Sequence, residues 1–475
     1  MNITFLGAAR TVTGSQHLLT INGKKLLLDC GLYQGSPQEA RERNTTFDFE
    51  PKSLDAVILS HAHIDHCGNL PNLVKQGFEG PIYCTPVTAH LADLLMRDSG
   101  SIQESEAEEI AEAAESVKAV EGRQPDGPEM YEPLYTAADA AEVKQYFMPT
   151  LYNTPFEVFP GVTASLVDAG HIFGSAAVQI DVEEKGNKKR RVWFSGDVGR
   201  QNLPLVRDPV MPEDVNVLIM ECTYGDKDHG DPLEAYDRLR EAIAQTIDRG
   251  GRVIIPAFAV GRTQEIVYYM HQMIERGEIP EIPVYVDSPL ASEASKIFTD
   301  HPEYLDDEAR KFMNDAESRS ALGFEMLRYI ESSRESRQLN TREDPMVIIS
   351  TSGMMETGRV LHHTRFSIED PRDTILLVSY QAPNTLGRAL QNGEKQIRIM
   401  GRVYERKANV VTISGLSAHA GQSYLVDYAK AVKSSLEKTF LVHGEDTPAE
   451  ALQEKLKDAG IEKTYYPYLR QSMEI

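Results

Sequence analysis

Six short apolar runs in this chain of 475 residues each end at a polar side chain. They lie at residues 25–29, 163–171, 192–197, 216–221, 410–414 and 439–443. Runs of this length, bounded by Gly, Asp or His, predict buried β-strands. A single sheet edge that gathers the ends of these strands would explain why the pattern recurs. The chain is therefore expected to form an α/β fold with a site along the ends of its strands.

The densest group of polar side chains follows another apolar run, Leu54–Leu59. Residues 60–68 read Ser-His-Ala-His-Ile-Asp-His-Cys-Gly, which places three histidines and one aspartate within six consecutive positions. Imidazole and carboxylate groups are ligands that suit zinc. A histidine-rich surface loop is the alternative, but four potential ligands seldom coincide at this spacing. The stretch predicts a metal site where a strand gives way to a loop.

The net charge of −23 comes from 72 acidic and 49 basic residues spread along the chain. It argues against broad, non-specific binding of duplex nucleic acid. It does not exclude a nucleic-acid substrate, because bound dications and a locally basic surface reverse the potential where it matters. The four cysteines show no C-x-x-C spacing, which argues against a disulfide framework.

Neither a signal peptide nor a membrane span is expected. The N-terminal residues lack a basic segment followed by a long apolar one, and no segment approaches the roughly twenty apolar residues that a membrane helix requires. We expect a cytoplasmic protein with no membrane partner.

Residues 226–400 are expected to form a separate α/β unit. The pattern predicts helices over 232–249 and 263–275 and strands over 251–258, 284–287 and 346–350. This alternation is typical of parallel βαβ units. Candidate ligands occur on both sides of the unit, so we interpret it as an insertion. The predicted domains are residues 1–225 and 401–475, which together form the first domain, and the insertion 226–400.

The spacing His61-x-His63-x-Asp65-His66 resembles the metallo-β-lactamase fold, with Asp29 ahead of it and further candidates behind it. Those candidates are His171, Asp197 and His443. The resemblance implies an αββα sandwich, in which helices cover two facing sheets and the metals lie at one edge.

Three further motifs resemble those of the β-CASP nucleases, which process RNA or DNA. They are Glu-Cys-Thr-Tyr-Gly-Asp at 221–226, Ser-Ala-His at 417–419 and Leu-Val-His-Gly-Glu at 441–445. Additional matches lie at 5–14, 29–35, 261–264 and 352–355. The chain is thus similar to the endonuclease subunit of the pre-mRNA 3′-end cleavage factor and to its prokaryotic RNA-processing relatives, with an α/β β-CASP domain inserted in the sandwich.

This resemblance implies a cofactor of two zinc ions and assigns their ligands. His61, His63 and His171 would bind one zinc, whereas Asp65, His66 and His443 would bind the other. Asp197 would bridge the pair, since a carboxylate can span two cations and a neutral imidazole nitrogen cannot. Between such ions a water ionises near neutral pH and can attack phosphorus.

Four residues are candidates for catalytic roles: Asp29, Asp65, Glu221 and His419. Asp29 is expected to orient a ligating histidine or the bridging water. The resemblance makes His419 the acid that protonates the leaving oxygen, with Glu221 orienting its ring and raising its pKa. The alternative for His419 is a structural histidine.

A Ser/Thr/Gly turn at 350–353 follows a predicted strand and leads into a predicted helix from Met354. Such a turn can present backbone amides to a phosphate, although small hydroxyl residues also cap ordinary helices. We predict phosphate contacts for Thr351, Ser352, Gly353 and Arg359; the alternative for Arg359 is a structural surface residue.

Taken together, these features favour a zinc-dependent ribonuclease acting on single-stranded RNA in a cleft between the two domains. A thioester or lactone hydrolase of the same fold and a DNA-directed nuclease are alternatives. A third alternative is a non-catalytic RNA-binding subunit, which predicts missing ligands, whereas every expected ligand is present. Endonuclease and 5′-to-3′ exonuclease activity both stay open, as do a monomer and a homodimer.

Overall fold

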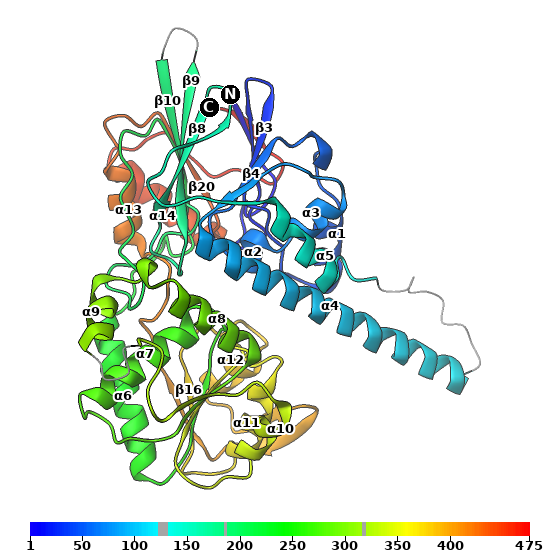
Figure 1. The fold of residues 1–475 in the computed structure, drawn as a ribbon, viewed down its shortest axis with the longest axis vertical. Coiled ribbons are helices and arrows are strands. Elements are labelled where there is room, and N and C mark those ends of the chain that lie inside the picture. Colours follow the sequence, from blue (N-terminus) through cyan, green and yellow to red (C-terminus); the bar gives the residue numbers. More distant parts are fainter. Residues whose placement is uncertain (122–131, 185–187, 316–319) are drawn as a thin grey trace. The chain divides into compact units, whose positions relative to one another are not determined.

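The computed structural model describes residues 1–121, 132–184, 188–315 and 320–475, in two compact units (Figure 1). The first unit comprises residues 1–199, 209–227 and 419–475, and the second comprises residues 200–208 and 228–418. Both chain ends belong to the first unit, where the first and last strands pair with each other.

Sheet A of the first unit has seven strands in the order β22-β1-β2-β3-β4-β5-β6. Strands β1 to β3 and β22 pair antiparallel, whereas β3 to β6 run parallel to one another. The strands are β1 (Asn2–Phe5), β2 (His17–Ile21), β3 (Lys24–Leu28), β4 (Ala56–Ile58), β5 (Ile82–Cys84), β6 (Phe147–Pro149) and β22 (Ser472–Glu474).

Sheet B also has seven strands, in the order β21-β20-β11-β10-β9-β8-β7. Strands β8 and β10 both run antiparallel to β9, and β11, β20 and β21 continue parallel to β10. As a result, β8, β10, β11 and β20 all end at the same edge. The strands are β7 (Phe156–Phe159), β8 (Val162–Asp168), β9 (Ala176–Glu184), β10 (Lys188–Phe194), β11 (Val217–Glu221), β20 (Lys438–Val442) and β21 (Thr464–Tyr465).

The two sheets face each other across one apolar core. Phe5 of sheet A contacts Phe440 of sheet B, with ring centroids 5.3 Å apart, and both rings are fully buried. The opposite face of sheet B packs on α13 (Gln422–Lys430) and α14 (Asp446–Asp458). Trp193 of β10 donates a hydrogen bond to the Tyr428 hydroxyl of α13 at 2.7 Å.

The remaining helices of the first unit lie on the side of sheet A (Figure 1). They are α1 (Pro37–Thr45), α2 (Ile64–Cys67), α3 (Leu70–Lys75), α4 (Pro86–Glu121) and α5 (Ala137–Glu142). The first unit is therefore the sandwich of two sheets between helices that the sequence predicts. None of the described helices is both long enough and apolar enough to cross a bilayer.

The second unit is built on a six-stranded parallel sheet in the order β14-β13-β15-β12-β16-β19. The strands are β12 (Val253–Pro256), β13 (Val284–Asp287), β14 (Leu327–Tyr329), β15 (Val347–Ser350), β16 (Thr374–Leu377) and β19 (Asn409–Thr412). A separate hairpin is formed by β17 (Gln396–Ile399) and β18 (Arg402–Glu405).

Helices of the second unit alternate with these strands, as the βαβ pattern predicts. They are α6 (Pro232–Asp248), α7 (Arg262–Glu275), α8 (Pro289–Asp300), α9 (Asp307–Asp315), α10 (Ser333–Leu339), α11 (Arg359–Ser367) and α12 (Leu386–Gln391). The predicted helices at 232–249 and 263–275 and the three predicted strands of this region are confirmed.

One predicted strand joins a different sheet from the one expected. The run at 410–414 was predicted to end at the same edge as the other five runs, but it forms β19, which pairs with β16 in the sheet of the second unit. An apolar run specifies a buried strand, whereas the neighbour it pairs with is decided by the fold as a whole.

A buried carboxylate organises the end of β13. Asp287, whose side chain is fully buried, accepts hydrogen bonds from His363 at 2.6 Å and Ser336 at 2.6 Å, and it forms a 2.7 Å ion pair with Arg359. Burial alone would raise the pKa of Asp287, but the hydrogen bonds from His363, Ser336 and Arg359 outweigh it and hold the pKa below its usual value. The carboxylate is therefore ionised and depends on its three donors.

Replacing Arg359 with Gln is expected to lower the free energy of unfolding by about 1.5–3 kcal/mol at pH 7, because a buried carboxylate loses a charged partner. A carboxylate with a lowered pKa contributes stability above its unfolded pKa and loses it as the pH falls through the folded pKa. The deficit should therefore shrink from pH 7 toward about pH 3. Urea unfolding at several pH values measures it.

Arg372→Gln is the control, since its ion pair with Asp370 lies at the surface and should matter much less. A deficit for Arg359→Gln that stayed constant with pH would contradict the role given to Asp287.

Candidate metal centre

The seven predicted metal ligands all belong to the first unit and gather where its strands end. Parallel strands place their C-terminal ends together, so residues that are far apart in sequence meet at one edge. His61 follows β4, His63 precedes α2, and Asp65 and His66 lie within α2, while His171 follows β8, Asp197 follows β10 and His443 follows β20.

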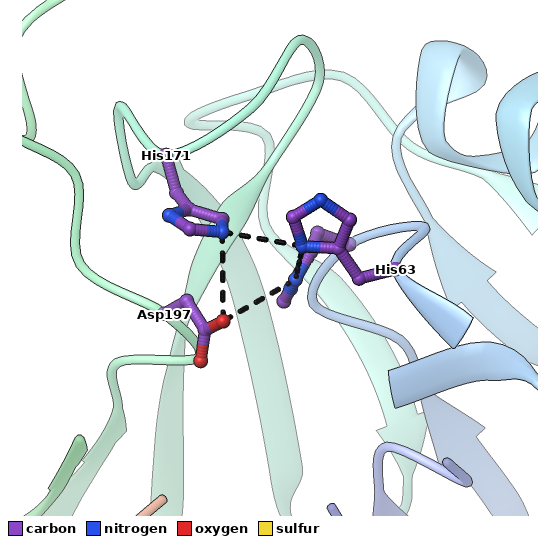
Figure 2. Close-up of side chains that lie close together, drawn as sticks. His63, His171 and Asp197 are labelled. Carbon is purple, nitrogen blue, oxygen red and sulfur yellow. Dashed lines mark hydrogen bonds and ion pairs between the residues drawn. The ribbon is translucent and has the colours of Figure 1, made fainter. Parts of the chain in front are cut away.

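Four of these residues form a first group: His61, His63, His171 and Asp197. Nδ1 of His63 lies 3.0 Å from Nε2 of His61 and 3.3 Å from Nε2 of His171. Oδ2 of Asp197 lies 3.6 Å from the His61 nitrogen and 3.5 Å from the His171 nitrogen. Figure 2 shows His63, His171 and Asp197 pointing toward one another from separate loops.

A second group contains Asp65, His66 and His443. Nε2 of His443 lies 3.3 Å from Nε2 of His66 and 3.2 Å from Oδ2 of Asp65. The Asp65 oxygen is 3.8 Å from the His66 nitrogen. Burial alone would raise the pKa of Asp65, but His66 and His443 outweigh it and lower the pKa to about 2. The group therefore offers one carboxylate and two imidazoles.

Asp197 lies between the two groups. Its Oδ2 faces the first group, while its Oδ1 lies 3.4 Å from Nε2 of His66 and 3.4 Å from Nδ1 of His443. Oδ1 is buried and accepts no hydrogen bond, which is costly for a carboxylate oxygen unless a cation satisfies it. The surrounding histidines overcome the effect of burial and hold the pKa of Asp197 well below its usual range.

These donor sets fit zinc. Nitrogen and oxygen ligands about 2.0–2.1 Å from a tetrahedral zinc are about 3.3 Å from one another. The four separations given above for the first group are 3.0 to 3.6 Å, close to that value. Burial, the largest effect, keeps the pKa of His61 and His171 well below the usual value and that of His63 at about 4. These imidazoles are therefore neutral and have lone pairs to donate.

The ring of His66 is oriented by Asp29. Oδ2 of Asp29 lies 2.7 Å from Nδ1 of His66, so the opposite nitrogen, Nε2, is directed at Asp65 and His443. Asp29 in turn accepts hydrogen bonds from the Ser60 amide at 2.7 Å and hydroxyl at 2.9 Å, and from the Ser15 hydroxyl at 3.2 Å. A carboxylate behind a ligating imidazole fixes its tautomer and its basicity.

Two hydroxyl residues that the sequence did not identify support other ligands. Ser60 lies 3.0 Å from Nδ1 of His61, and Thr223 lies 3.1 Å from Nδ1 of His443. Thr223 falls within the motif at 221–226, and Ser60 directly precedes His61. Their positions in a motif and next to a predicted ligand are the sequence features that could have identified them. No spacing in the sequence connects Ser15 with Asp29.

The loop after β3 requires a glycine next to the Asp65 backbone. A Cβ on Gly31 would lie 1.6 Å from the carbonyl oxygen of Asp65. Asp29 itself has a φ of 59°, and His443 has a φ of 49°. Residues other than glycine rarely adopt such positive φ angles. Close packing of this kind holds strained residues in place at a site.

Glu221 and His419 form a pair beside Asp197. Nδ1 of His419 lies 2.9 Å from Oε1 and 3.1 Å from Oε2 of the fully buried Glu221. Nε2, the other ring nitrogen, lies 3.9 Å from Oδ2 of Asp197. Burial alone would lower the pKa of His419, but Glu221 and Asp197 outweigh it and raise the pKa to about 9. In the metal-free protein, His419 is therefore an imidazolium at neutral pH.

His419 also satisfies the spacing of a ligand. Together with Asp197 and His443 it forms a third group whose donor atoms lie within 4.8 Å of one another. Because Glu221 holds Nδ1, only Nε2 could serve a metal or a substrate oxygen.

The predicted phosphate contacts lie in the second unit. Thr351 Oγ1 lies 3.2 Å from the Ser288 hydroxyl, and the Ser352 hydroxyl accepts from the amides of Glu356 and Thr357. Gly353 is buried against Phe258, and its carbonyl accepts from Gln381 at 2.9 Å. The following helix begins at Arg359, not at Met354 as predicted, because residues 351–358 form a loop that reaches its cap at Gly358.

The Arg359 guanidinium already has partners inside the second unit. Besides Asp287, it donates to the carbonyls of Ile330 at 3.1 Å and Glu331 at 2.7 Å. Phosphate binding by Arg359 stays a prediction, and its ion pair gives it a structural role as well.

Three family models match the chain. The metallo-beta-lactamase superfamily matches residues 10–139, the Beta-Casp domain matches 263–390, and the Zn-dependent metallo-hydrolase RNA specificity domain matches 403–467.

Known proteins resemble the chain over nearly its full length. Ribonuclease TTHA0252 of Thermus thermophilus is 33% identical and covers 97% of both chains. Transcription termination factor FttA of Methanosarcina mazei is 32% identical over 96% of this chain and 69% of its own length. A crystal structure of a protein of unknown function from Enterococcus faecalis V583 shares the fold, with a TM-score of 0.54, 13% identity and coverage of 99% of both chains.

Replacing His66 with Ala is expected to remove a ligand and lower the bound zinc, with loss of hydrolysis. Asp29→Asn should keep the ligand but weaken zinc affinity by roughly 10- to 100-fold, because the ring loses its carboxylate partner. Elemental analysis and chelator competition measure both effects. His362→Ala, at an exposed histidine of α11, is the control. Full zinc content in His66→Ala would contradict the ligand assignment.

Proposed function

Because this chain belongs to the β-CASP family of the metallo-β-lactamase superfamily, a family of metal-dependent hydrolases, we propose that it is a ribonuclease that uses two zinc ions to hydrolyse single-stranded RNA. The observation that carries the proposal is the position of Asp197, whose two oxygens face two separate groups of ligands. A carboxylate placed in this way suits a pair of metals that share one bridge. The name of the Thermus relative and the RNA specificity domain favour RNA.

We assign the ligands to the two ions from the two groups of donor atoms. His61, His63 and His171 would hold one zinc, and Asp65, His66 and His443 would hold the other. When bound, the ions supply an ionised water at neutral pH and stabilise negative charge on the phosphate. Asp29 and Ser60 keep the ligands in position through the hydrogen bonds described above.

Protonation of the leaving oxygen is the role that we assign to His419. Glu221 holds Nδ1, so the proton on Nε2 is the one that can be delivered. Donation of this proton to the 3′ oxygen of the leaving nucleoside would leave a 3′-hydroxyl on one product and a 5′-phosphate on the other. Glu221 is a positioning residue, since it acts through the His419 ring and accepts from the amides of Val198 and Thr223.

The loop at 351–353 is proposed to contact substrate phosphate through its hydroxyls and backbone. Thr351 and Ser352 are half-buried, so part of each remains accessible, whereas Gly353 is buried. The absence of a Cβ at Gly353 keeps the loop close to Phe258, where a side chain would approach to 3.2 Å.

Replacing His419 with Ala is expected to slow RNA cleavage by roughly 10²- to 10⁴-fold while zinc content stays unchanged, because a general acid is lost but no ligand. Glu221→Gln should show a smaller defect, since its amide can still hold the ring. Single-turnover cleavage and elemental analysis on the same preparations separate the two roles. Loss of zinc in His419→Ala would instead make His419 a ligand.

The deciding experiment for the function uses RNA labelled either internally or at its 5′ end, incubated with protein of known zinc content. A ladder of internal fragments identifies an endonuclease, whereas release of mononucleotides identifies an exonuclease. Single-stranded DNA and a thioester serve as competing substrates. If the protein hydrolysed the thioester readily and left the RNA uncleaved, the proposal would be overturned. If it cleaved DNA but not RNA, the substrate would be DNA.

A further inference from the structure

The hairpin formed by β17 and β18 stands apart from the main sheet of the second unit as its own two-stranded sheet. Its strands pair Arg398 with Val403 and Ile399 with Arg402. The connection is Met400-Gly401, with φ angles of 47° and 80°. Two consecutive residues with positive φ are the signature of a type I′ turn, which matches the twist of a tight hairpin.

One face of the hairpin is anchored and the other faces solvent. Ile397 and Ile399 are each 1% exposed and pack in a core of the second unit, with Tyr404 beside them. Gln396 and Arg398 alternate with them on β17 and are exposed, as is Val403 opposite Arg398 on β18. A strand with one buried face and one polar face holds its outward side chains at fixed positions.

The hairpin is strongly cationic, and its cations lie on both faces: Arg398 is on the outward face opposite Val403, whereas Arg402 lies opposite Ile399 and is nonetheless exposed. Residues 394–407, which we call the basic hairpin, contain five cationic residues and two acidic ones, a local excess of three positive charges in a chain of net charge −23. The cations are Lys395, Arg398, Arg402, Arg406 and Lys407. Such an excess within an acidic protein creates a local positive potential that the overall charge does not predict.

Most of these cations are not neutralised by carboxylates. Within the described residues, Lys407 pairs with Glu405 at 3.6 Å, whereas Lys395, Arg398 and Arg402 form no ion pair. Arg406 donates to the backbone carbonyls of Glu394 at 2.9 Å and Ala408 at 3.3 Å, which fixes the base of the hairpin. Arg398 also donates to the carbonyl of Gly401 at 3.3 Å. Three cations therefore have no carboxylate partner and remain for an external anion.

The tip of the hairpin departs from local structural preference. Type I′ turns favour Asn, Asp or Gly at the position that Met400 occupies. Met400 nevertheless lies there with 54% of its surface exposed, and Val403 nearby is 53% exposed. An exposed apolar residue in an unfavourable conformation contributes little to the fold, and such departures concentrate at functional sites.

We propose that the basic hairpin is a second RNA-contact surface, separate from the metal centre. Lys395, Arg398 and Arg402 would bind phosphates of the RNA backbone, with Met400 against a base. This inference rests on the proposed ribonuclease function. Cations beside exposed apolar side chains fit a single strand, which offers phosphates and unstacked bases together. An acidic protein segment is the alternative partner. Its carboxylates would match the cations, but it would offer no base for the exposed apolar side chains of Met400 and Val403 to contact.

The test compares two triple variants of the full chain that remove the same charge. In the hairpin variant, Lys395, Arg398 and Arg402 become Gln. In the control, Lys311, Arg334 and Arg337, exposed cations of α9 and α10 in the same unit, become Gln. Binding to a labelled 30-nucleotide poly(U) RNA is measured by fluorescence anisotropy across a series of KCl concentrations. A His419→Ala background in both variants and in the reference prevents cleavage.

The hairpin variant should lower the slope of log affinity against log salt by about 2, since each phosphate contact to a single strand contributes roughly 0.7. Between 50 and 200 mM KCl, the reference should therefore lose roughly 20-fold more affinity than the hairpin variant. The control should keep the slope of the reference. With His419 intact, the hairpin variant should cleave a five-nucleotide RNA at the normal rate and the 30-nucleotide RNA with a reduced kcat/KM.

Three results would overturn the inference. An unchanged salt slope in the hairpin variant, with RNA cleavage intact, would reject the hairpin surface and leave the ribonuclease standing. Equal loss in the control would show that the effect comes from total charge. Failure of the reference protein to bind RNA would reject the ribonuclease function and the hairpin surface together. Met400→Asn, which suits the turn better, should weaken poly(U) binding without lowering the melting temperature.

Discussion

The carboxylate of Asp197 is the interaction on which the site depends. Its two oxygens reach two groups of ligands, and one of them has no hydrogen-bond donor although it is buried. In a protein interior this arrangement is unfavourable unless cations compensate it. The imidazoles of His61 and His171 beside it point the same way, because burial lowers their pKa and keeps them neutral. The electrostatics of the region therefore suit a metal centre.

Strand direction is what brings these groups together. Strands β8, β10, β11 and β20 run the same way in sheet B, so residues separated by hundreds of positions meet at one edge. Sheet A contributes its four ligands from the loop and helix after β4, and Asp29, which orients His66, follows the neighbouring parallel strand β3. The apolar core between the sheets holds the two edges together, and hydroxyls of Ser60 and Thr223 fix the rings. The positions of the candidate ligands at the sheet edge thus depend on the packing of the apolar core inside the first unit.

The second unit uses the same principle with a different outcome. Asp287 also ends a parallel strand, yet its oxygens are satisfied internally by Arg359, His363 and Ser336. Both oxygens of Asp287 have hydrogen-bond donors, whereas Oδ1 of Asp197 has none. Position at a strand end therefore does not by itself identify a functional site. The two carboxylates differ in whether a buried oxygen lacks a hydrogen-bond donor, as Oδ1 of Asp197 does. The basic hairpin shows the complementary case, in which cations without carboxylate partners remain accessible on an acidic protein.

The sequence alone was enough to predict the fold class, the family and most of the candidate site. The ligand spacing at 61–66 and the motifs around Glu221, His419 and His443 predicted the fold class and the family, because they depend on local order and on residue chemistry. The helices and strands of the insertion followed from periodicity in the same way. Tertiary structure alone decided that the run at 410–414 joins the inserted sheet, that Ser15 supports Asp29, and that Arg359 pairs with Asp287. These outcomes depend on which distant segments meet, and a periodic pattern carries no information about that pairing.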